Sequence, residues 1–112
     1  EAKEYIHDKK FALTYTQEKF EFNNWGPYKV RNHLFKKGIS KSVAENCIQQ
    51  VFGDKAIKES IVELIKKKKK RYQREPAEKR KKKMFDFLMR KGYPSEQITE
   101  YMPLLLDIVD KR

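Results

Sequence analysis

The sequence predicts an all-α protein in which two tandem three-helix repeats, similar to helix-turn-helix units, stack as an elongated right-handed array. Three observations predict this class. Apolar residues recur at helical spacing along each long segment. Only four glycines and four prolines are present, too few for the many turns of an all-β protein. The segment Leu34–Ile39 is repeated at Leu88–Tyr93, 54 residues later.

The first half of the chain predicts three helices separated by short breaks. The first is expected over residues 8–22, where the apolar positions have a loosely helical spacing. Pro27 begins the second helix, since a first-turn residue needs no backbone donor, and Gly38 ends it in the left-handed conformation. Ser40 is expected to cap the third helix, which ends at Gly53.

The second half predicts three more helices in the same order. The fourth begins with Asp54 as its cap and carries the cations of residues 66–71 in its last turns, where they complement the helix dipole. Pro76 begins the fifth helix, Gly92 ends it, and the sixth begins two or three residues later. Pro103 is expected to kink or split this last helix, because it lacks a backbone donor and clashes one turn back.

The repeat divides the chain into two units, residues 8–53 and residues 54–112. A three-helix unit of this size cannot bury its apolar face alone, so each unit is expected to stack on its neighbour. Two stacked units form a long, slightly curved rod.

Positive charge is concentrated in one stretch of the chain. Residues 66–92 hold fourteen basic and three acidic side chains, which equals the whole net charge of +11. Such a field raises the local concentration of polyanions and of acidic surfaces. We therefore expect a nucleic-acid-binding or filament-binding surface formed by Lys66, Lys67, Lys68, Lys69, Lys70, Arg71, Arg74, Lys79, Arg80, Lys82, Lys83, Arg90 and Lys91. The alternative is a solvated face that only keeps the chain soluble.

The predicted fifth helix separates a basic side from an apolar side. Its basic side is expected to carry Lys79, Lys82, Lys83 and Arg90. Lys81 falls on the apolar side, so its aliphatic stem is expected to lie along the edge of the core. Three i,i+4 ion pairs are expected along this helix: Glu75 with Lys79, Glu78 with Lys82, and Asp86 with Arg90.

Aromatic residues near the basic stretch allow two interpretations. Trp25 is interpreted as a structural plug between the first and second helices, because it lies beside the proline that begins the second. The alternative is a platform on which a nucleic-acid base stacks. Tyr72 and Tyr93 flank the basic helix, where they could touch DNA, but their spacing matches the core pattern.

The sequence does not favour catalysis or a cofactor. Cys47 lies on the apolar face of a helix, where a thiol is usually an inert hydrophobic group. His7 and His33 are each alone in their segments, and no acids cluster at metal-ligand spacing. The sequence has no glycine-rich phosphate loop and no carboxylate pair placed for acid–base chemistry. We expect no catalytic residue, no metal and no other cofactor.

The composition also indicates a cellular setting. No apolar run approaches the roughly 20 residues that span a bilayer, and the first residues do not resemble a signal peptide. The single cysteine forms no intrachain disulfide and does not indicate an oxidising compartment. We therefore expect a cytoplasmic monomer that has no membrane partner.

Three segments of the chain resemble the RecX family of bacterial recombination regulators. They are Tyr5–Ala12, the segment from Trp25-Gly26-Pro27 through Val30 and Leu34 to Lys37-Gly38-Ile39, and Pro76–Tyr93. Each motif is common alone, but their order and spacing over residues 5–47 and 56–102 make the resemblance specific.

Members of this family are built from three tandem three-helix units. The chain resembles the second and third units, and residues 1–7 resemble the end of the first, as expected for a fragment of a longer protein. The chain departs from the family pattern at two places. Residues 17–19 are Gln, Glu and Lys where the family is often arginine-rich, and His33 stands where an acid is common.

The resemblance implies a regulator rather than an enzyme. It implies binding along the helical groove of the RecA–DNA filament, inhibition of the recombinase and coprotease activities of RecA, and a part in DNA repair, recombination and the SOS response. The implied partners are a RecA-like recombinase filament and single- or double-stranded DNA. Two alternatives stay open from the residues: a stand-alone basic helical protein that binds DNA or RNA, and an interaction scaffold whose charge only confers solubility.

Overall fold

Helices are the only regular secondary structure in the residues that the structure describes. The computed structural model describes the backbone of residues 2–111 and the side chains of residues 8–111, so the imidazole of His7 lies outside the described part. The all-α prediction is confirmed. The helices in chain order are α1 (Ala2–Asn23), α2 (Pro27–Lys36), α3 (Lys41–Val51), α4 (Asp54–Lys67), α5 (Lys69–Gln73), α6 (Ala77–Lys91) and α7 (Ser95–Asp110).

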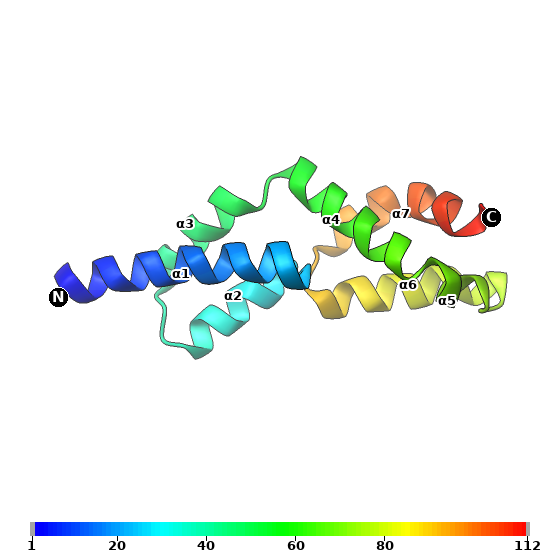
Figure 1. Ribbon diagram of the computed structural model, residues 1–112. Helices are drawn as coiled ribbons and strands as arrows, with labels where there is room; N and C mark the ends of the chain where they lie inside the picture. The colour runs from blue at the N-terminus through cyan, green and yellow to red at the C-terminus, as the bar shows by residue number, and fades with distance from the viewer. Residues whose placement is uncertain (1, 112) are drawn as a thin grey trace.

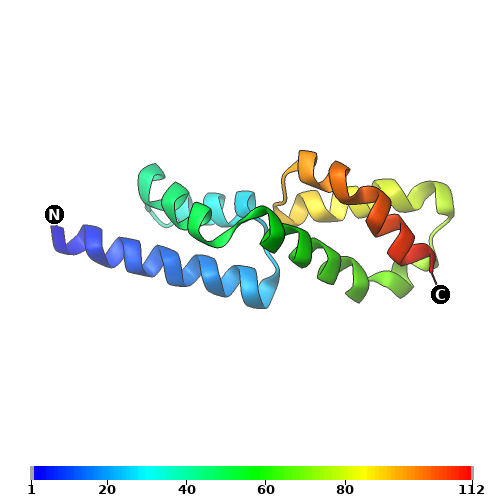
Figure 2. The same cartoon turned by 90° about the horizontal axis from the view of Figure 1, so that it is seen from above.

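The helices form an elongated rod of 55 × 21 × 21 Å. Helices α1, α2 and α3 pack together at one end, and α4 to α7 pack together at the other, with the two termini at opposite ends (Figures 1 and 2). The rod shape expected from the repeat is confirmed. A rod exposes a long lateral surface, and its charge can therefore act along its whole length.

Several helix ends lie where the sequence places them. Pro27 is the first residue of α2, and the Ser40 side chain accepts a hydrogen bond of 3.3 Å from the backbone N–H of Val43. Gly38 follows α2 with φ +85°, and Gly92 follows α6 with φ +97°. Both glycines therefore adopt the left-handed conformation, which L side chains rarely adopt.

The predicted fourth helix is wrong in two details. Gly53, not Asp54, is the N-cap of α4, and the Asp54 carboxylate instead accepts a hydrogen bond from the Gln97 side chain at 3.1 Å. The helix also ends at Lys67, because Lys68 has φ −100° and ψ 6°, and α5 continues beyond it. This break redirects the chain so that Tyr72 is buried in the core, with 5% of its surface exposed. Burial of the Tyr72 ring stabilises the break between α4 and α5, which lies within a run of basic residues.

Helix α7 contains Pro103 and continues through it, so of the two expected outcomes, a kink or a split, the split does not occur. Met102 and Leu105, on either side of the proline, are buried in the core. Pro103 itself is exposed, so water can solvate the carbonyl that loses its backbone partner. Core packing of the flanking residues therefore holds the helix together across the proline.

The two halves of the rod, α1 to α3 and α4 to α7, meet at a polar joint in its middle. The Tyr93 hydroxyl donates to the Asn24 carbonyl at 2.8 Å and lies 2.5 Å from Ser60 Oγ. The Asn24 side-chain amide donates to Ser60 Oγ at 3.2 Å. Because the Tyr93 proton is donated to Asn24, Ser60 donates to Tyr93. The three residues form a closed cycle, in which Asn24 donates from its side-chain amide and accepts at its backbone carbonyl. Burial raises the pKa of Tyr93 well above its usual value, so this residue remains a neutral donor.

Backbone hydrogen bonds complete this joint. The N–H of Gly26 donates to the Lys91 carbonyl at 2.7 Å, and the N–H of Tyr28 donates to the Gly92 carbonyl at 2.9 Å. A Cβ on Gly26 would lie 2.5 Å from the Gly92 carbonyl carbon, closer than real Cβ atoms approach. The start of α2 therefore docks directly on the end of α6, and only glycine permits this approach.

Candidate nucleic-acid interface

The predicted binding residues lie at the end of α4, on α5 and its two flanking residues, and on α6. Nine of them are exposed: Lys66, Lys67, Lys70, Arg71, Arg74, Lys79, Lys82, Lys83 and Arg90. Four are partly buried: Lys68, Lys69, Arg80 and Lys91. The basic residues of this one stretch of sequence thus lie on neighbouring helices of the structure. Their exposed ammonium and guanidinium groups can neutralise phosphates or acidic side chains.

Four of these residues meet in a polar cleft between α5 and α6. The cleft has a volume of about 260 Å³ and is lined by Lys68, Arg71, Tyr72, Glu75, Lys83, Asp86, Phe87 and Arg90. Two carboxylates stand among four basic side chains, so the cleft retains a net positive charge. A cleft with this lining has the charge to attract an anion and an aromatic wall at Phe87.

The ion pairs of α6 differ from those predicted. Glu75 pairs with Lys83 at 2.6 Å instead of Lys79, and the Lys83 hydrogen bond holds the pKa of Glu75 below its usual value. Asp86 pairs with Lys82 at 3.1 Å instead of Arg90. Among the described residues, the expected pair of Glu78 with Lys82 does not form. Glu75 precedes α6, in the turn after α5, and this turn directs its carboxylate across the cleft.

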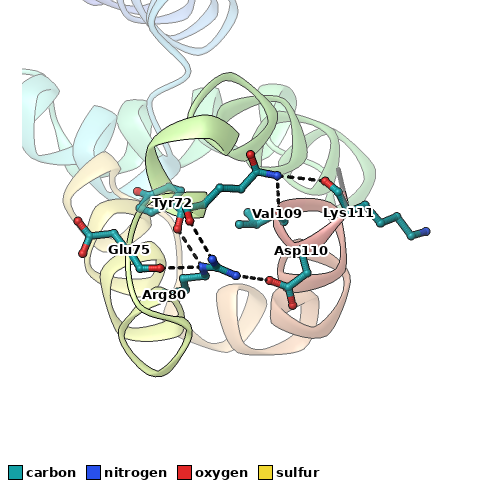
Figure 3. A network of polar contacts seen from close by, with 7 residues as sticks. Tyr72, Glu75, Arg80, Val109, Asp110 and Lys111 are labelled. Atoms are coloured by element: carbon teal, nitrogen blue, oxygen red, sulfur yellow. Dashed lines mark hydrogen bonds and ion pairs between the residues drawn. The ribbon is translucent and has the colours of Figure 1, made fainter.

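Arg80 is placed differently from the other predicted binding residues. Its Nε donates to the carbonyls of Tyr72 and Glu75 at 2.9 and 3.1 Å, and its Nη2 donates to the Gln73 carbonyl at 2.9 Å (Figure 3). Its Nη1 forms an ion pair with Asp110 of α7 at 2.8 Å. These contacts supply donors to the carbonyls of Tyr72 and Gln73 at the end of α5 and to the carbonyl of Glu75 in the turn after it. Arg80 thus connects α5, α6 and α7. Its donors are engaged within the fold, and its side chain is only partly exposed.

Lys81 lies where its stem was expected. It is exposed, yet it borders a small apolar hollow together with Phe85, Met102, Pro103 and Leu106. Its methylene groups therefore cover the edge of the core between α6 and α7, as expected for a lysine on the apolar side of a helix.

Lys29 is a member of the basic surface that the sequence did not reveal. Lys91 donates from Nζ to the Asn23 carbonyl at 3.2 Å. Its burial, and then the charges of Lys29, Lys68 and Lys67, lower the pKa of Lys91. Lys29 belongs to α2, far from the charged stretch in sequence. Only the close approach of α2 to the end of α6 brings it there, and no local sequence signal encodes that approach.

Trp25 lies between α1 and α2 and contacts side chains of both, as its interpretation as a plug predicts. Its ring meets Tyr15 of α1 edge-on at 6.4 Å and His33 of α2 at 4.6 Å. The side chain is only partly buried, and two lysine ammonium groups lie over it. By contrast, Tyr72 and Tyr93 are buried in the core, so their rings are not available to bases.

Other chemistry is poorly represented in the described part of the chain. Cys47 is buried, and burial raises the pKa of its thiol. Among the described residues, no group of three or more His, Cys, Asp or Glu side chains is placed to hold a metal ion. None of the described helices has the length and apolar character to cross a membrane.

Comparison with known proteins identifies the family. The model of the second three-helix domain of RecX matches residues 8–48, and that of the third three-helix domain matches residues 57–102. Proteins called Regulatory protein RecX from Bacillus cereus (strain AH820), Bacillus anthracis (strain CDC 684 / NRRL 3495) and Bacillus thuringiensis subsp. konkukian are each 33% identical over 106 residues.

These alignments cover 95% of the chain but only 39% of each relative, so the chain spans well under half of their length. A search of the solved structures gave no significant match. The two domain matches lie in the order of the repeat, and the relatives align across nearly the whole chain. The chain therefore belongs to the RecX family.

Proposed function

We propose that this chain regulates a RecA-like recombinase by binding in the groove of the RecA–DNA filament and inhibiting its activities. The observation that carries the proposal is the exposed basic surface of α4 to α6 on a narrow rod of the RecX family. A filament of recombinase and DNA offers phosphates and acidic side chains, and such a surface attracts both.

The geometry of the rod supports this mode of binding. Its length of 55 Å is more than twice its width of 21 Å, so it can follow a groove while contacting several filament subunits. We propose that the two repeats, residues 8–53 and residues 54–112, act as one rigid arm with the second repeat supplying most of the charge. Its cytoplasmic, monomeric state is part of the same proposal.

The residues proposed to make the contact lie on the exposed side of α6. Lys79, Lys82 and Lys83 are exposed, and their ion-pair partners, Asp86 and Glu75, leave the set with an excess of positive charge. Exposed ion pairs of this kind contribute little to stability. These lysines can therefore exchange their carboxylate partners for phosphates at small cost to the fold.

The experiment measures RecA-driven ATP hydrolysis and strand exchange with the chain added. We expect the chain to slow both at substoichiometric amounts, and we expect the variant with Lys79, Lys82 and Lys83 replaced by Glu to leave them unchanged. The variant should keep its helical circular dichroism. A control with Lys36, Lys41 and Lys55 replaced by Glu has the same net charge at exposed positions outside this surface and should still inhibit.

A second candidate function is direct binding of DNA or RNA without a recombinase. It is favoured by the polar cleft and by the lysines that gather around Lys91 at the joint. If the chain leaves both RecA rates unchanged but retards bare DNA in a gel, the second function is correct and the first is wrong. If the triple lysine variant inhibits as well as the wild type does, the proposed α6 contact is wrong.

A further inference from the structure

Aromatic rings and lysine ammonium groups alternate along α1 and α2. The rings of Phe11 and Tyr15 stack with centroids 5.8 Å apart, and Tyr15 meets Trp25 at 6.4 Å. Lys19 Nζ lies 5.1 Å from the centre of the Trp25 ring, and Lys29 Nζ lies 4.6 Å from it. This end of the rod therefore carries a row of rings with cations above them, outside the basic stretch of α4 to α6.

Lys29 links this row to the second repeat. A Cβ placed on Gly92 would lie 2.5 Å from Lys29 Cβ, so the Lys29 stem rests on the end of α6, next to Lys91. The charges that act on Lys91 come from Lys29, Lys67 and Lys68, with no carboxylate among them. The joint thus brings lysines of both repeats together. One of them, Lys67, is paired with Glu63 at 3.0 Å, so the group keeps an excess of positive charge that favours an anion.

The same pattern continues beyond the joint. Lys68 Nζ lies 5.4 Å from the centre of the Phe87 ring. Phe87 forms the partly exposed aromatic wall of the cleft between α5 and α6, beside Arg71 and Arg90. Rings with cations beside them therefore lie on both sides of the joint, on α1 and α2 and at the cleft.

We propose that Tyr15, Trp25, Lys29, Lys91, Lys68 and Phe87 form a track for a single strand of nucleic acid. Phosphates bind at the ammonium groups, and unpaired bases pack against the rings. Every base has a stacking face, so such a track binds without strong sequence preference, whereas the bases of a duplex are stacked on each other. The lysines over Trp25 have long flexible stems, and a phosphate can draw them off the ring.

The track is a property of this chain and does not rest on recognition of a recombinase. Because Trp25 is the sole tryptophan, its fluorescence reports directly on the centre of the track. We expect saturable quenching when an oligothymidylate is added, and weaker binding of a duplex of the same length. The affinity is measured in parallel from the anisotropy of a labelled oligothymidylate.

Two variants test the phosphate sites and the stacking sites separately. Lys29→Gln with Lys68→Gln removes two ammonium groups and should lower the affinity about tenfold, with a log–log salt dependence shallower by about 1.4. The matched control, Lys41→Gln with Lys55→Gln, should bind as the wild type does. Tyr15→Leu should lower the affinity about tenfold by removing a ring, whereas Phe22→Leu, at an aromatic side chain 78% exposed and outside the track, should not.

Unchanged affinity of the Lys29/Lys68 variant, or equal affinity for duplex and single strand, would overturn the track. Neither the Lys29/Lys68 variant nor Tyr15→Leu removes a hydrogen bond that the described side chains form. An unchanged melting temperature checks that both variants are folded. Inhibition of RecA together with absence of oligothymidylate binding contradicts the track alone. Oligothymidylate binding without any effect on RecA supports the track and contradicts the proposed regulation.

Discussion

The repeated segments at the ends of α2 and α6 share a local structure and differ in their surroundings. Gly38 and Gly92 both have positive φ, at +85° and +97°. A Cβ on Gly38 would meet no atom within 4 Å, whereas a Cβ on Gly92 would lie 2.5 Å from the backbone nitrogen of Lys29. The sequence pattern thus determines the local backbone conformation in both copies. Only the second copy, at Gly92, also packs against the neighbouring repeat.

The residue after each glycine shows the same difference. Ile39 is an apolar core residue with 6% of its surface exposed. Tyr93, at the equivalent position, is fully buried and uses its hydroxyl to bind Asn24 and Ser60 across the joint. The copy that joins the repeats therefore carries a polar group that the other copy lacks.

The largest expected effect tests whether the two copies are equal in packing. Leu34 and Leu88 are both fully buried, so Leu34→Ala and Leu88→Ala should each lower the free energy of unfolding by about 2–5 kcal/mol. Equilibrium urea unfolding measures both. A loss below about 1 kcal/mol in either variant would show that its leucine does not pack in the core as described.

The next effect should separate the two copies. Gly38→Ala forces only an unfavourable backbone conformation and should cost about 1 kcal/mol. Gly92→Ala adds a clash with the backbone of Lys29 and should cost about 3 kcal/mol or more. The same urea experiment measures both free energies, and equal losses would show that the α2–α6 approach is looser than the structure indicates.

The smallest effect concerns the hydroxyl of Tyr93. Tyr93→Phe leaves the Asn24 carbonyl without its donor and should lower stability by about 1–2 kcal/mol at neutral pH. Burial raises the folded-state pKa of Tyr93 above the ordinary value of 10.0, so its contribution is complete below pH 10 and is lost as pH rises further. The difference between wild type and variant should therefore shrink above pH 10.

Urea unfolding at several pH values measures this difference, and Tyr28→Phe is the control because Tyr28 is exposed. A constant difference between wild type and Tyr93→Phe across pH 10 would contradict the assignment of Tyr93 as a buried neutral donor.

Much of the fold could be predicted because its signals are local. Pro27 begins a helix, Ser40 caps one, and Gly38 and Gly92 end two, all through the conformational preferences of single residues. The buried positions follow from helical periodicity for the same reason. The break at Lys68 was missed because it depends on where Tyr72 finds room in the core, which local spacing does not contain.

The candidate interface was less predictable because its geometry is tertiary. Arg80 has the same charge as its neighbours, yet the end of α5 takes up its donors. Glu75 forms its ion pair with Lys83 because the turn after α5 orients its carboxylate toward Lys83. The pair does not depend on helical i,i+4 spacing. Lys29 enters the surface only through the docking of α2 on α6. A count of charges identifies a basic region of the sequence, but tertiary packing determines which of its side chains remain exposed and able to bind a partner.

The closed cycle of Asn24, Ser60 and Tyr93 has a consequence for how the molecule comes apart. Each of the three residues donates a hydrogen bond to the next. Partial separation of the two halves therefore leaves several buried donors and acceptors without partners at the same time. An intermediate with one half folded and the joint open is therefore penalised. In tandem-repeat proteins such interfacial coupling makes neighbouring units melt in concert, and this chain should lose both halves in a single cooperative transition.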